Sequence, residues 1–149
     1  MKKAVQLTLS AFLLIFMLAI TINTMQDNEE IWKSVPGYEG KYQVSNLGRV
    51  RSVSFYKFGK LYNRKNPLQL KYYQVDGGYY VVVLQINKDR DHLLVNRLVL
   101  SVFDGCTDDK LCADHINRVT TDNRLTNLRW LSQKDNNPHN QKHLPTVKT

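Results

Sequence analysis

Apolar and polar residues follow three patterns along the chain. Residues 9–22 are almost wholly apolar, whereas residues 31–86 form short β-branched and aromatic runs between turn residues, which is typical of β-strands. Residues 94–103 instead place apolar side chains at i, i+3, i+4, i+7 and i+8, which predicts an amphipathic helix. Residues 111–116 and 128–131 then read as two strands. The pattern predicts a β-rich first part followed by a helix and a hairpin.

The β-rich part contains two predicted turns. Residues 45–48 end in Gly48, where a positive φ is expected, and residues 76–78 have the Asp-Gly-Gly sequence of a hairpin turn. After the first turn, residues 49–53 alternate with period two, which puts both arginines of this strand on one face. Residues 55–71 are expected to be a basic connector, broken at Asn66-Pro67. Its aromatic side chains could stack on nucleic acid, but we expect them to contribute to a small core.

Two helix boundaries are predicted in the second part. Gly105 is expected to end the helix over residues 94–103. Residues 132–135, Ser-Gln-Lys-Asp, have the form of a capping box, which would start a helix at Gln133 and put Asn136 on its second turn. Pro138 would keep that helix short or kinked.

The N-terminal residues 1–24 allow three interpretations. Two lysines precede the apolar run, as in an export signal, and the run is somewhat short for a membrane anchor. Alternatively, translation starts at Met25 and residues 1–24 are an upstream extension. A start at Met25 predicts a cytoplasmic protein, whereas a genuine signal or anchor predicts an exported or membrane-tethered one.

The positive charge of the chain is concentrated in its first part. The formal charge is +8, and residues 31–90 carry eleven Lys/Arg against three acids, whereas residues 91–149 carry eight against seven. This distribution suits a first part that binds the backbone of nucleic acid, and it is equally compatible with a basic surface that serves only solubility. No obligate protein partner is indicated. The candidate nucleic-acid-binding residues are Lys41, Arg49, Arg51, Lys57, Lys60, Arg64, Lys65 and Lys71.

The two cysteines do not indicate a zinc site. Cys106 and Cys112 lack the close CxxC spacing of zinc ligands, and two cysteines cannot make a four-cysteine site. A disulfide between them requires an exported protein, and reduced thiols are expected in a cytosolic one.

Polar residues near the end of the chain suit metal-dependent hydrolysis. Asp114 and His115 are adjacent, and Asn127 and Asn136 follow His115 by 12 and 21 residues. A carboxylate beside an imidazole, followed by carboxamides, can hold one hard divalent cation and one water at a phosphodiester. Taken alone, an Asp-His pair is more often a surface pair, and in this Asn-rich stretch Asn123, Asn127 or Asn136 could each be a turn residue.

Two stretches resemble known families. EIWKSVPGYEGKYQVSNLGRVRS, residues 30–52, resembles the small modular domain that accompanies phage and intron-encoded HNH endonucleases. LLVNRLVLSVF, ADHINR and DNRLTNLRWLSQKDN resemble the HNH endonuclease family, in particular the form found in phage homing nickases. Together the resemblances cover residues 30–140. Asn96 departs from the family pattern, which commonly has His at this place.

The resemblance implies an α+β fold, in which a small N-terminal β-rich module precedes a ββα-metal (HNH, His-Me finger) nuclease domain. The expected organisation is a hydrophobic segment or extension, a nuclease-associated DNA-binding module, an HNH domain and a tail, at residues 1–24, 25–66, 67–143 and 144–149.

The resemblance also implies a role for each polar residue. Asp114 and Asn136 would bind one Mg²⁺ or Mn²⁺ ion, and His115 would be the general base. Asn127 would either fix the His115 imidazole or hold the loop backbone. The implied function is a metal-dependent DNA endonuclease that leaves a 5′-phosphate and a 3′-hydroxyl. The alternative is a catalytically silent DNA-binding protein that retains the HNH scaffold.

Overall fold

The structure is a computed structural model, and it describes residues 11–18, 29–86 and 89–137. The chain divides into two compact units, residues 1–30 and residues 31–149, which are described separately.

In the first unit, residues 11–18 are helical and their apolar side chains are exposed. No helix within the described ranges is long and apolar enough to cross a membrane. The remainder of the predicted signal or anchor, at residues 1–10 and 19–24, lies outside the described residues.

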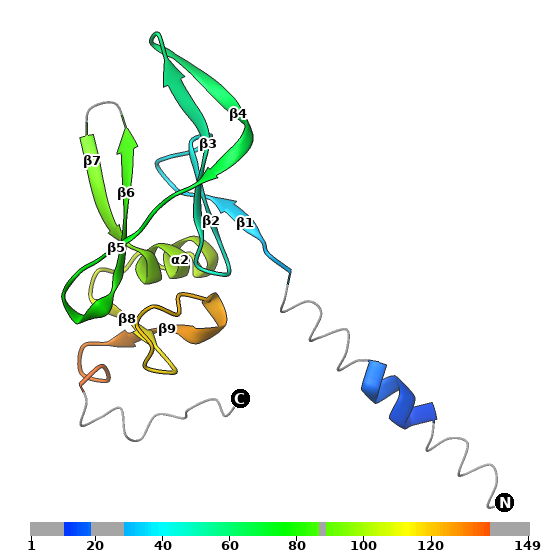
Figure 1. Cartoon of the computed structure of the whole chain (residues 1–149). Coiled ribbons are helices and arrows are strands. Elements are labelled where there is room, and N and C mark those ends of the chain that lie inside the picture. The colour runs from blue at the N-terminus through cyan, green and yellow to red at the C-terminus, as the bar shows by residue number, and fades with distance from the viewer. Residues whose placement is uncertain (1–10, 19–28, 87–88, 138–149) are drawn as a thin grey trace, which may run out of the picture. The chain divides into compact units, whose positions relative to one another are not determined.

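The described residues of the second unit, 31–86 and 89–137, form three antiparallel sheets and one α-helix (Figure 1). The first sheet has the order β1-β2-β3-β4, the second β5-β6-β7 and the third β8-β9. In chain order the elements are β1 (Trp32–Ser34), β2 (Tyr42–Ser45), β3 (Val50–Lys57), β4 (Lys60–Gln69), β5 (Tyr73–Gln74), the 3₁₀ turn η1 (Asp76–Gly78), β6 (Tyr80–Ile86), β7 (Asp89–Leu94), α2 (Val95–Asp104), β8 (Leu111–His115), the 3₁₀ turn η2 (Leu125–Asn127) and β9 (Leu128–Ser132).

Strands β3 and β4 form one long hairpin, so the connector predicted over residues 55–71 was wrong. Lys57 pairs with Lys60 across a tight turn, in which Phe58 has φ 50° and Gly59 has φ 75°. Pro67 does not break β4, because β4 is an edge strand and a proline can be accommodated on its open side.

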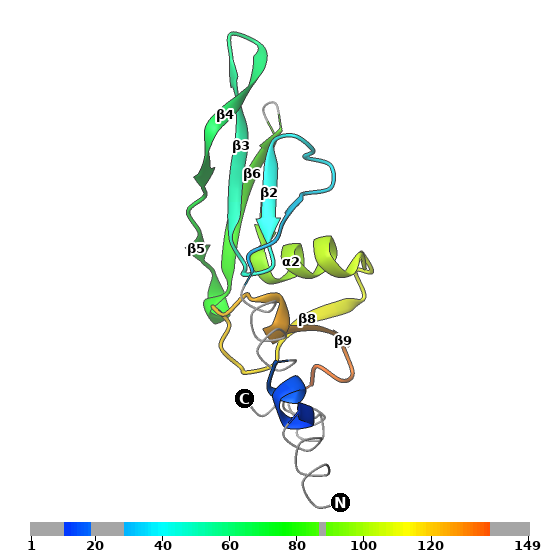
Figure 2. The same cartoon turned by 90° about the vertical axis from the view of Figure 1, so that its right-hand side faces the viewer.

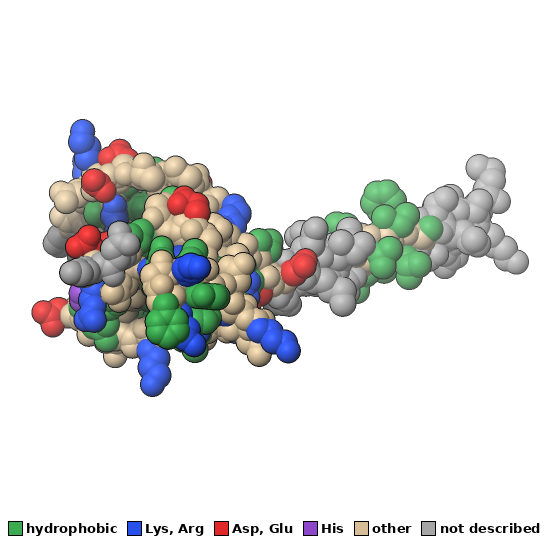
Figure 3. Space-filling model, turned by 90° about the horizontal axis from the view of Figure 1, so that it is seen from above, with side chains coloured by type: hydrophobic (Ala, Val, Ile, Leu, Met, Phe, Trp, Pro, Cys, Tyr) green, Lys and Arg blue, Asp and Glu red, His purple; other side chains and the backbone are tan. Residues whose placement is uncertain are grey.

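The aromatic side chains of this hairpin do not fill a core, which corrects a second expectation. Phe58 is 90% exposed, and Tyr56 and Tyr62 are also exposed. The physical reason is visible in Figure 2, where the far end of β3 and β4 extends away from α2 and the other strands. Seen from above, basic and hydrophobic side chains lie beside one another on this unit (Figure 3).

The second sheet contains the predicted Asp-Gly-Gly turn and one strand that was not predicted. Gly77 and Gly78 have φ of 82° and 80°, which glycine adopts without steric cost. Strand β7 begins with four exposed charged or polar residues, at 89–92, and therefore lacks the apolar alternation that identifies a strand from sequence. It forms because it pairs along its whole length with the apolar strand β6.

Helix α2 confirms the predicted amphipathic helix and its end. Gly105 is the C-cap, with φ 76°, and its backbone N–H donates to Ser101 O at 3.1 Å. Val95 and Val99 are fully buried. Burying a side chain of this size contributes about 1.5–3 kcal/mol, so the apolar face anchors α2 to the sheets.

One hydrophobic core connects the sheets with α2. It includes Val44 and Val50 from the first sheet, Val82 from the second, Val99 from α2 and Leu128 from β9. The α+β fold is confirmed, with a β-rich N-terminal part followed by helix α2 and the β8–β9 hairpin. The division at residue 66 stays a prediction, and residues from both sides of it contribute to this core.

Candidate active site

The end of strand β8 places Asp114 and His115 in the interior. Asp114 is 8% exposed and His115 is 3% exposed. Asp114 pairs with Arg129 and His115 with Leu128 in the β8–β9 register. Neighbouring residues on a regular strand point to opposite faces, so Asp114 and His115 can serve one site only if the strand ends or bends there. Strand β8 ends at His115, and Arg118 in the following turn has φ 65°.

Asp114 is held by an ion pair across the two strands. Arg129 Nε donates to Asp114 Oδ2 at 2.8 Å, and both side chains are mostly buried. The pair orients the carboxylate and leaves Oδ1 as the oxygen without this partner.

The His115 imidazole lies between a carboxamide and an aromatic ring. Asn123 Oδ1 is 3.1 Å from His115 Nε2, and the ring centroid of Tyr79 is 5.8 Å from that of His115. Asn123 comes from the loop between β8 and β9 and is itself buried. Sequence reasoning named Asn123 only as a turn candidate. Its position eight residues after His115 carried no signal for this contact.

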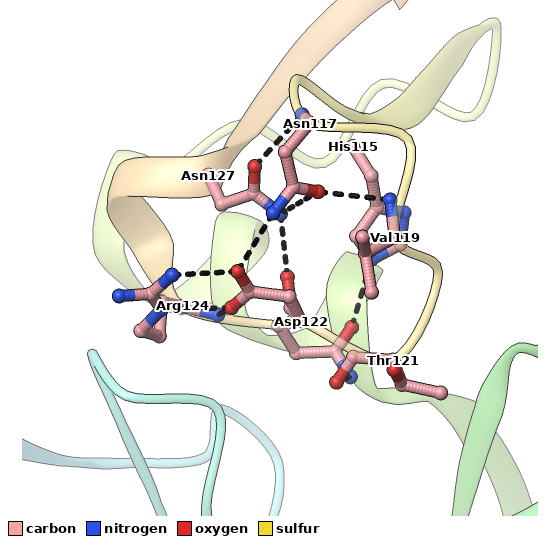
Figure 4. Close-up of polar contacts among 8 residues, drawn as sticks. His115, Asn117, Val119, Thr121, Asp122, Arg124 and Asn127 are labelled. Atoms are coloured by element: carbon pink, nitrogen blue, oxygen red, sulfur yellow. Dashed lines mark hydrogen bonds and ion pairs between the residues drawn. The ribbon is translucent and has the colours of Figure 1, made fainter. Parts of the chain in front are cut away.

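Asn127 makes the loop contacts that were one of its two predicted roles. Its Oδ1 accepts from Asn117 N at 3.0 Å, and its Nδ2 donates to Asn117 Oδ1 at 3.0 Å and to Asp122 O at 2.8 Å (Figure 4). The hydrogen bond that the structure gives the His115 ring goes to Asn123. The interpretation of Asn127 as the imidazole partner is therefore corrected.

The Asp122 carboxylate accepts further hydrogen bonds within the loop between β8 and β9. Arg124 Nε and Nη2 donate to its two carboxylate oxygens at 2.8 and 2.7 Å, and Asn117 Nδ2 donates at 2.9 Å (Figure 4). The hydrogen bonds from Arg124 hold the pKa of Asp122 below its ordinary value, against a smaller opposing effect of burial. The same pairing raises the pKa of Arg124.

Asn136 lies in a turn after β9, not in a helix. The capping contacts are present, since Ser132 Oγ is 2.7 Å from Asp135 Oδ2 and accepts from Asp135 N at 3.1 Å. Asn136 N donates to Ser132 O at 2.9 Å, which makes one helical turn, but residues 133–136 do not continue as a helix. The predicted helix over these residues was wrong, and its continuation from Pro138 lies outside the described residues.

The chemistry of the proposed metal ligands fits a hard divalent ion. Asp114 supplies a carboxylate and Asn136 a carboxamide oxygen, which are ligands that Mg²⁺ and Mn²⁺ accept. Within the described ranges there is no group of three or more His, Cys, Asp and Glu side chains that could hold an ion. An ion at Asp114 would therefore take much of its coordination from water and substrate phosphate, as Mg²⁺ commonly does.

The candidate DNA-binding residues lie mainly on the first sheet. Arg51 stacks on the Trp32 ring at 3.9 Å and donates twice to Gln43 Oε1. Arg64 lies 5.1 Å from the Phe55 ring centroid. Lys41 contacts the Tyr56 ring and Gln85 O, and its burial lowers the pKa of its ammonium group. Arg49 lies near the Trp32 ring, Lys57 and Lys60 lie at the β3–β4 turn, Lys65 is exposed on β4, and Lys71 is exposed just after it.

Comparison with known proteins identifies both parts of the chain. The HNH endonuclease family profile matches residues 94–138, and the NUMOD4 motif matches residues 30–85. The chain belongs to the HNH endonuclease family, with a NUMOD4 motif ahead of the HNH segment.

Two curated relatives and one solved structure show this similarity. The chain is 37% identical over 105 residues to DNA endonuclease I-HmuI of Bacillus phage SP01, covering 70% of the chain and 54% of that protein. It is 33% identical over 125 residues to an uncharacterized HNH endonuclease of Acanthamoeba polyphaga mimivirus, covering 80% of the chain and 28% of that protein. The chain also superposes on a solved structure of the HNH homing endonuclease I-HmuI, which was solved to describe DNA binding and cleavage by that enzyme. The TM-score is 0.60 at 33% identity, and the match covers 77% of this chain and 61% of that one. The chain thus spans about half of I-HmuI and less of the viral relative.

Proposed function

We propose that this protein is a metal-dependent endonuclease that hydrolyses phosphodiester bonds in double-stranded DNA. The observation that carries the proposal is the buried Asp114-His115 pair at the end of β8, in which Arg129 fixes the carboxylate and Asn123 contacts the imidazole. The family membership and the similarity to a phage DNA endonuclease support the same reaction.

His115 is the general base in the proposed reaction. With Nε2 bonded to Asn123, the Nδ1 lone pair takes the proton of the attacking water. Asn127 contributes indirectly, because it ties Asn117 and Asp122 together and so fixes the loop that carries Asn123. Asp114 and Asn136 would hold one Mg²⁺ or Mn²⁺ ion, which offsets negative charge on the phosphoryl and leaving oxygens when bound.

The first sheet is the proposed DNA-binding surface. Arg51, Arg64 and the lysines at the β3–β4 turn combine positive charge with aromatic rings on the first sheet. Basic side chains neutralise phosphates, and exposed rings can stack on bases or sugars. A DNA substrate places the proposed activity in the cytoplasm, and the alternative of export or anchoring depends on residues 1–24.

The test is a cleavage assay on supercoiled plasmid with Mg²⁺, Mn²⁺ or EDTA. We expect nicked or linear DNA with a divalent ion and none with EDTA, and we expect His115→Ala to slow the reaction by roughly 10²- to 10⁴-fold. His92→Ala is the matched control, because His92 lies on β7 and contacts the Tyr73 ring, whereas His115 contacts Asn123 and the Tyr79 ring. Full activity of His115→Ala would remove the mechanism.

A catalytically silent DNA-binding protein is the second candidate. The ion pair between Asp114 and Arg129 favours it, because one oxygen of the proposed metal ligand is already engaged. DNA binding that weakens with salt, without cleavage under any divalent ion, would support this candidate and reject the first.

A further inference from the structure

We propose that Asn123 is the residue that positions the His115 imidazole, and that the β2–β3 turn of the NUMOD4 segment holds Asn123 in place through Gly48. The inference rests on the proposed role of His115 as the general base, and it extends that role by naming the groups that set the orientation of the ring.

The amide of Asn123 is oriented by two contacts. Its Nδ2 donates to Thr121 O at 3.3 Å, and a carbonyl oxygen can only accept. Oδ1 is consequently the atom that faces His115 Nε2 at 3.1 Å. An oxygen acceptor at this place requires the hydrogen on Nε2, which leaves the lone pair on Nδ1.

The other contacts of the His115 ring constrain its flipped orientation less than the Asn123 hydrogen bond does. The terminal torsion of a histidine is broad and roughly two-fold, so packing alone distinguishes poorly between its two flipped orientations. Tyr79 lies against the ring at 5.8 Å between centroids, a contact that limits its tilt but does not distinguish its two nitrogens. The Asn123 oxygen supplies that distinction.

Asn123 is itself fixed by a turn that is distant in sequence. A Cβ added to Gly48 would lie 2.7 Å from both Cβ and O of Asn123, closer than real Cβ contacts allow. In the same turn, Asn46 O accepts from Leu125 N at 2.7 Å. Two adjacent contacts therefore hold the backbone of residues 123–125 against residues 46–48.

These contacts join the two family segments at the proposed active site. Residues 46–48 lie within the NUMOD4 match, and residues 123–125 lie within the HNH match. The NUMOD4 segment thus supports the loop that orients His115, in addition to any contact that it makes with DNA.

The first experiment compares Asn123→Leu, which removes the acceptor at similar size, with Asn123→Asp, which keeps an acceptor oxygen. Under single-turnover conditions at saturating DNA, we expect Asn123→Leu to cut on the order of 10- to 100-fold more slowly, with unchanged DNA affinity in a mobility-shift assay. Asn123→Asp should recover most of that loss. An unchanged rate for Asn123→Leu would overturn the proposal.

A double-mutant cycle separates positioning from general damage to the fold. If Asn123 acts through His115, adding Asn123→Leu to His115→Ala should cause no further loss of residual cleavage. An equal loss in both backgrounds would show a merely structural role and overturn the proposal.

The Gly48 contact has its own matched control. Gly48→Ala introduces both a positive-φ alanine and a clash, whereas Gly37→Ala, with the same φ of 78° and nothing within 4 Å of the added Cβ, introduces only the first. We expect Gly48→Ala to slow cleavage at least about 10-fold more than Gly37→Ala, with equal DNA affinity. Equal cleavage rates would contradict the supporting role of the turn.

One readout does not depend on cleavage. The ¹⁵N shifts of the neutral His115 ring should report hydrogen on Nε2 in the unmodified protein and a mixture of tautomers in Asn123→Leu. Hydrogen on Nδ1 in the unmodified protein would overturn the proposal even if the protein cuts DNA. The expected tautomer in a protein that cuts no DNA would uphold the positioning and reject only the proposed function.

Discussion

Arg129 and Asp114 face each other across β8 and β9, with 2.8 Å between Nε and Oδ2. Arg129→Leu would leave a mostly buried carboxylate without its partner. We expect a loss of about 3 kcal/mol in the free energy of unfolding, measured by urea denaturation.

The exposed pair between Arg97 and Asp109 provides the control for this change. The Asp109 side chain is fully exposed and its nearest approach is 3.7 Å, so Asp109→Ala should cost less than about 1 kcal/mol. Similar losses in the free energy of unfolding for the two variants would show that the Asp114–Arg129 pair stabilises the protein no more than an exposed ion pair does.

Asn127→Ala should loosen the loop between β8 and β9. It removes the acceptor for Asn117 N and the donor to Asp122 O, so we expect a loss of about 2 kcal/mol and faster hydrogen exchange at the Asn117 amide. Asn63→Ala, at an exposed position on β4, serves as the control and should leave both quantities nearly unchanged.

The acid stability of the protein should depend on Asp122. Because the Arg124 hydrogen bonds lower its folded-state pKa below 3.8, the contribution of Asp122 is fully present above that pH and is lost as the pH falls through the lowered value. Asp122→Asn should therefore reduce stability at pH 7 and flatten the decline below about pH 4. Urea midpoints at pH 7, 4, 3 and 2 measure this, and an unchanged acid limb would contradict it.

The proposed DNA contacts should appear as salt dependence. Lys57→Ala and Lys60→Ala, at the exposed β3–β4 turn, should each reduce the slope of log K against log salt by roughly 1. Lys110→Ala removes the same charge outside this sheet and is the control. A slope that falls equally in all three variants would indicate a diffuse charge effect, not a binding surface.

The elements that the sequence predicted correctly depend on local patterns. The α2 periodicity, its Gly105 cap and the Asp-Gly-Gly turn are each determined by residues a few positions apart, and all three are present in the structure. The missed elements depend on distant partners. Strand β7 forms against β6 despite its polar sequence, and β4 continues through Pro67 because it is an edge strand.

The same distinction applies within the candidate site. The Asp114-His115 pair and the Ser132-Asp135 contacts could be predicted because each involves near neighbours. The identity of the asparagine that contacts His115 could not be predicted, because it depends on the path of the loop between the two strands. That path is set partly by residues 46–48, which lie more than 70 positions earlier in the sequence.

The hydrophobic core that both family segments share limits how the NUMOD4 segment can be exchanged between relatives. Val44 and Val50 share that core with Val99 and Leu128. The two family segments therefore pack directly against each other through apolar side chains and are not held together by a flexible linker alone. A hybrid protein that takes only the NUMOD4 segment from a relative would contain one side of this packed interface without the matching residues of the other side. Recombination between such proteins should therefore succeed when volumes on the two sides change together, and should otherwise yield unstable hybrids.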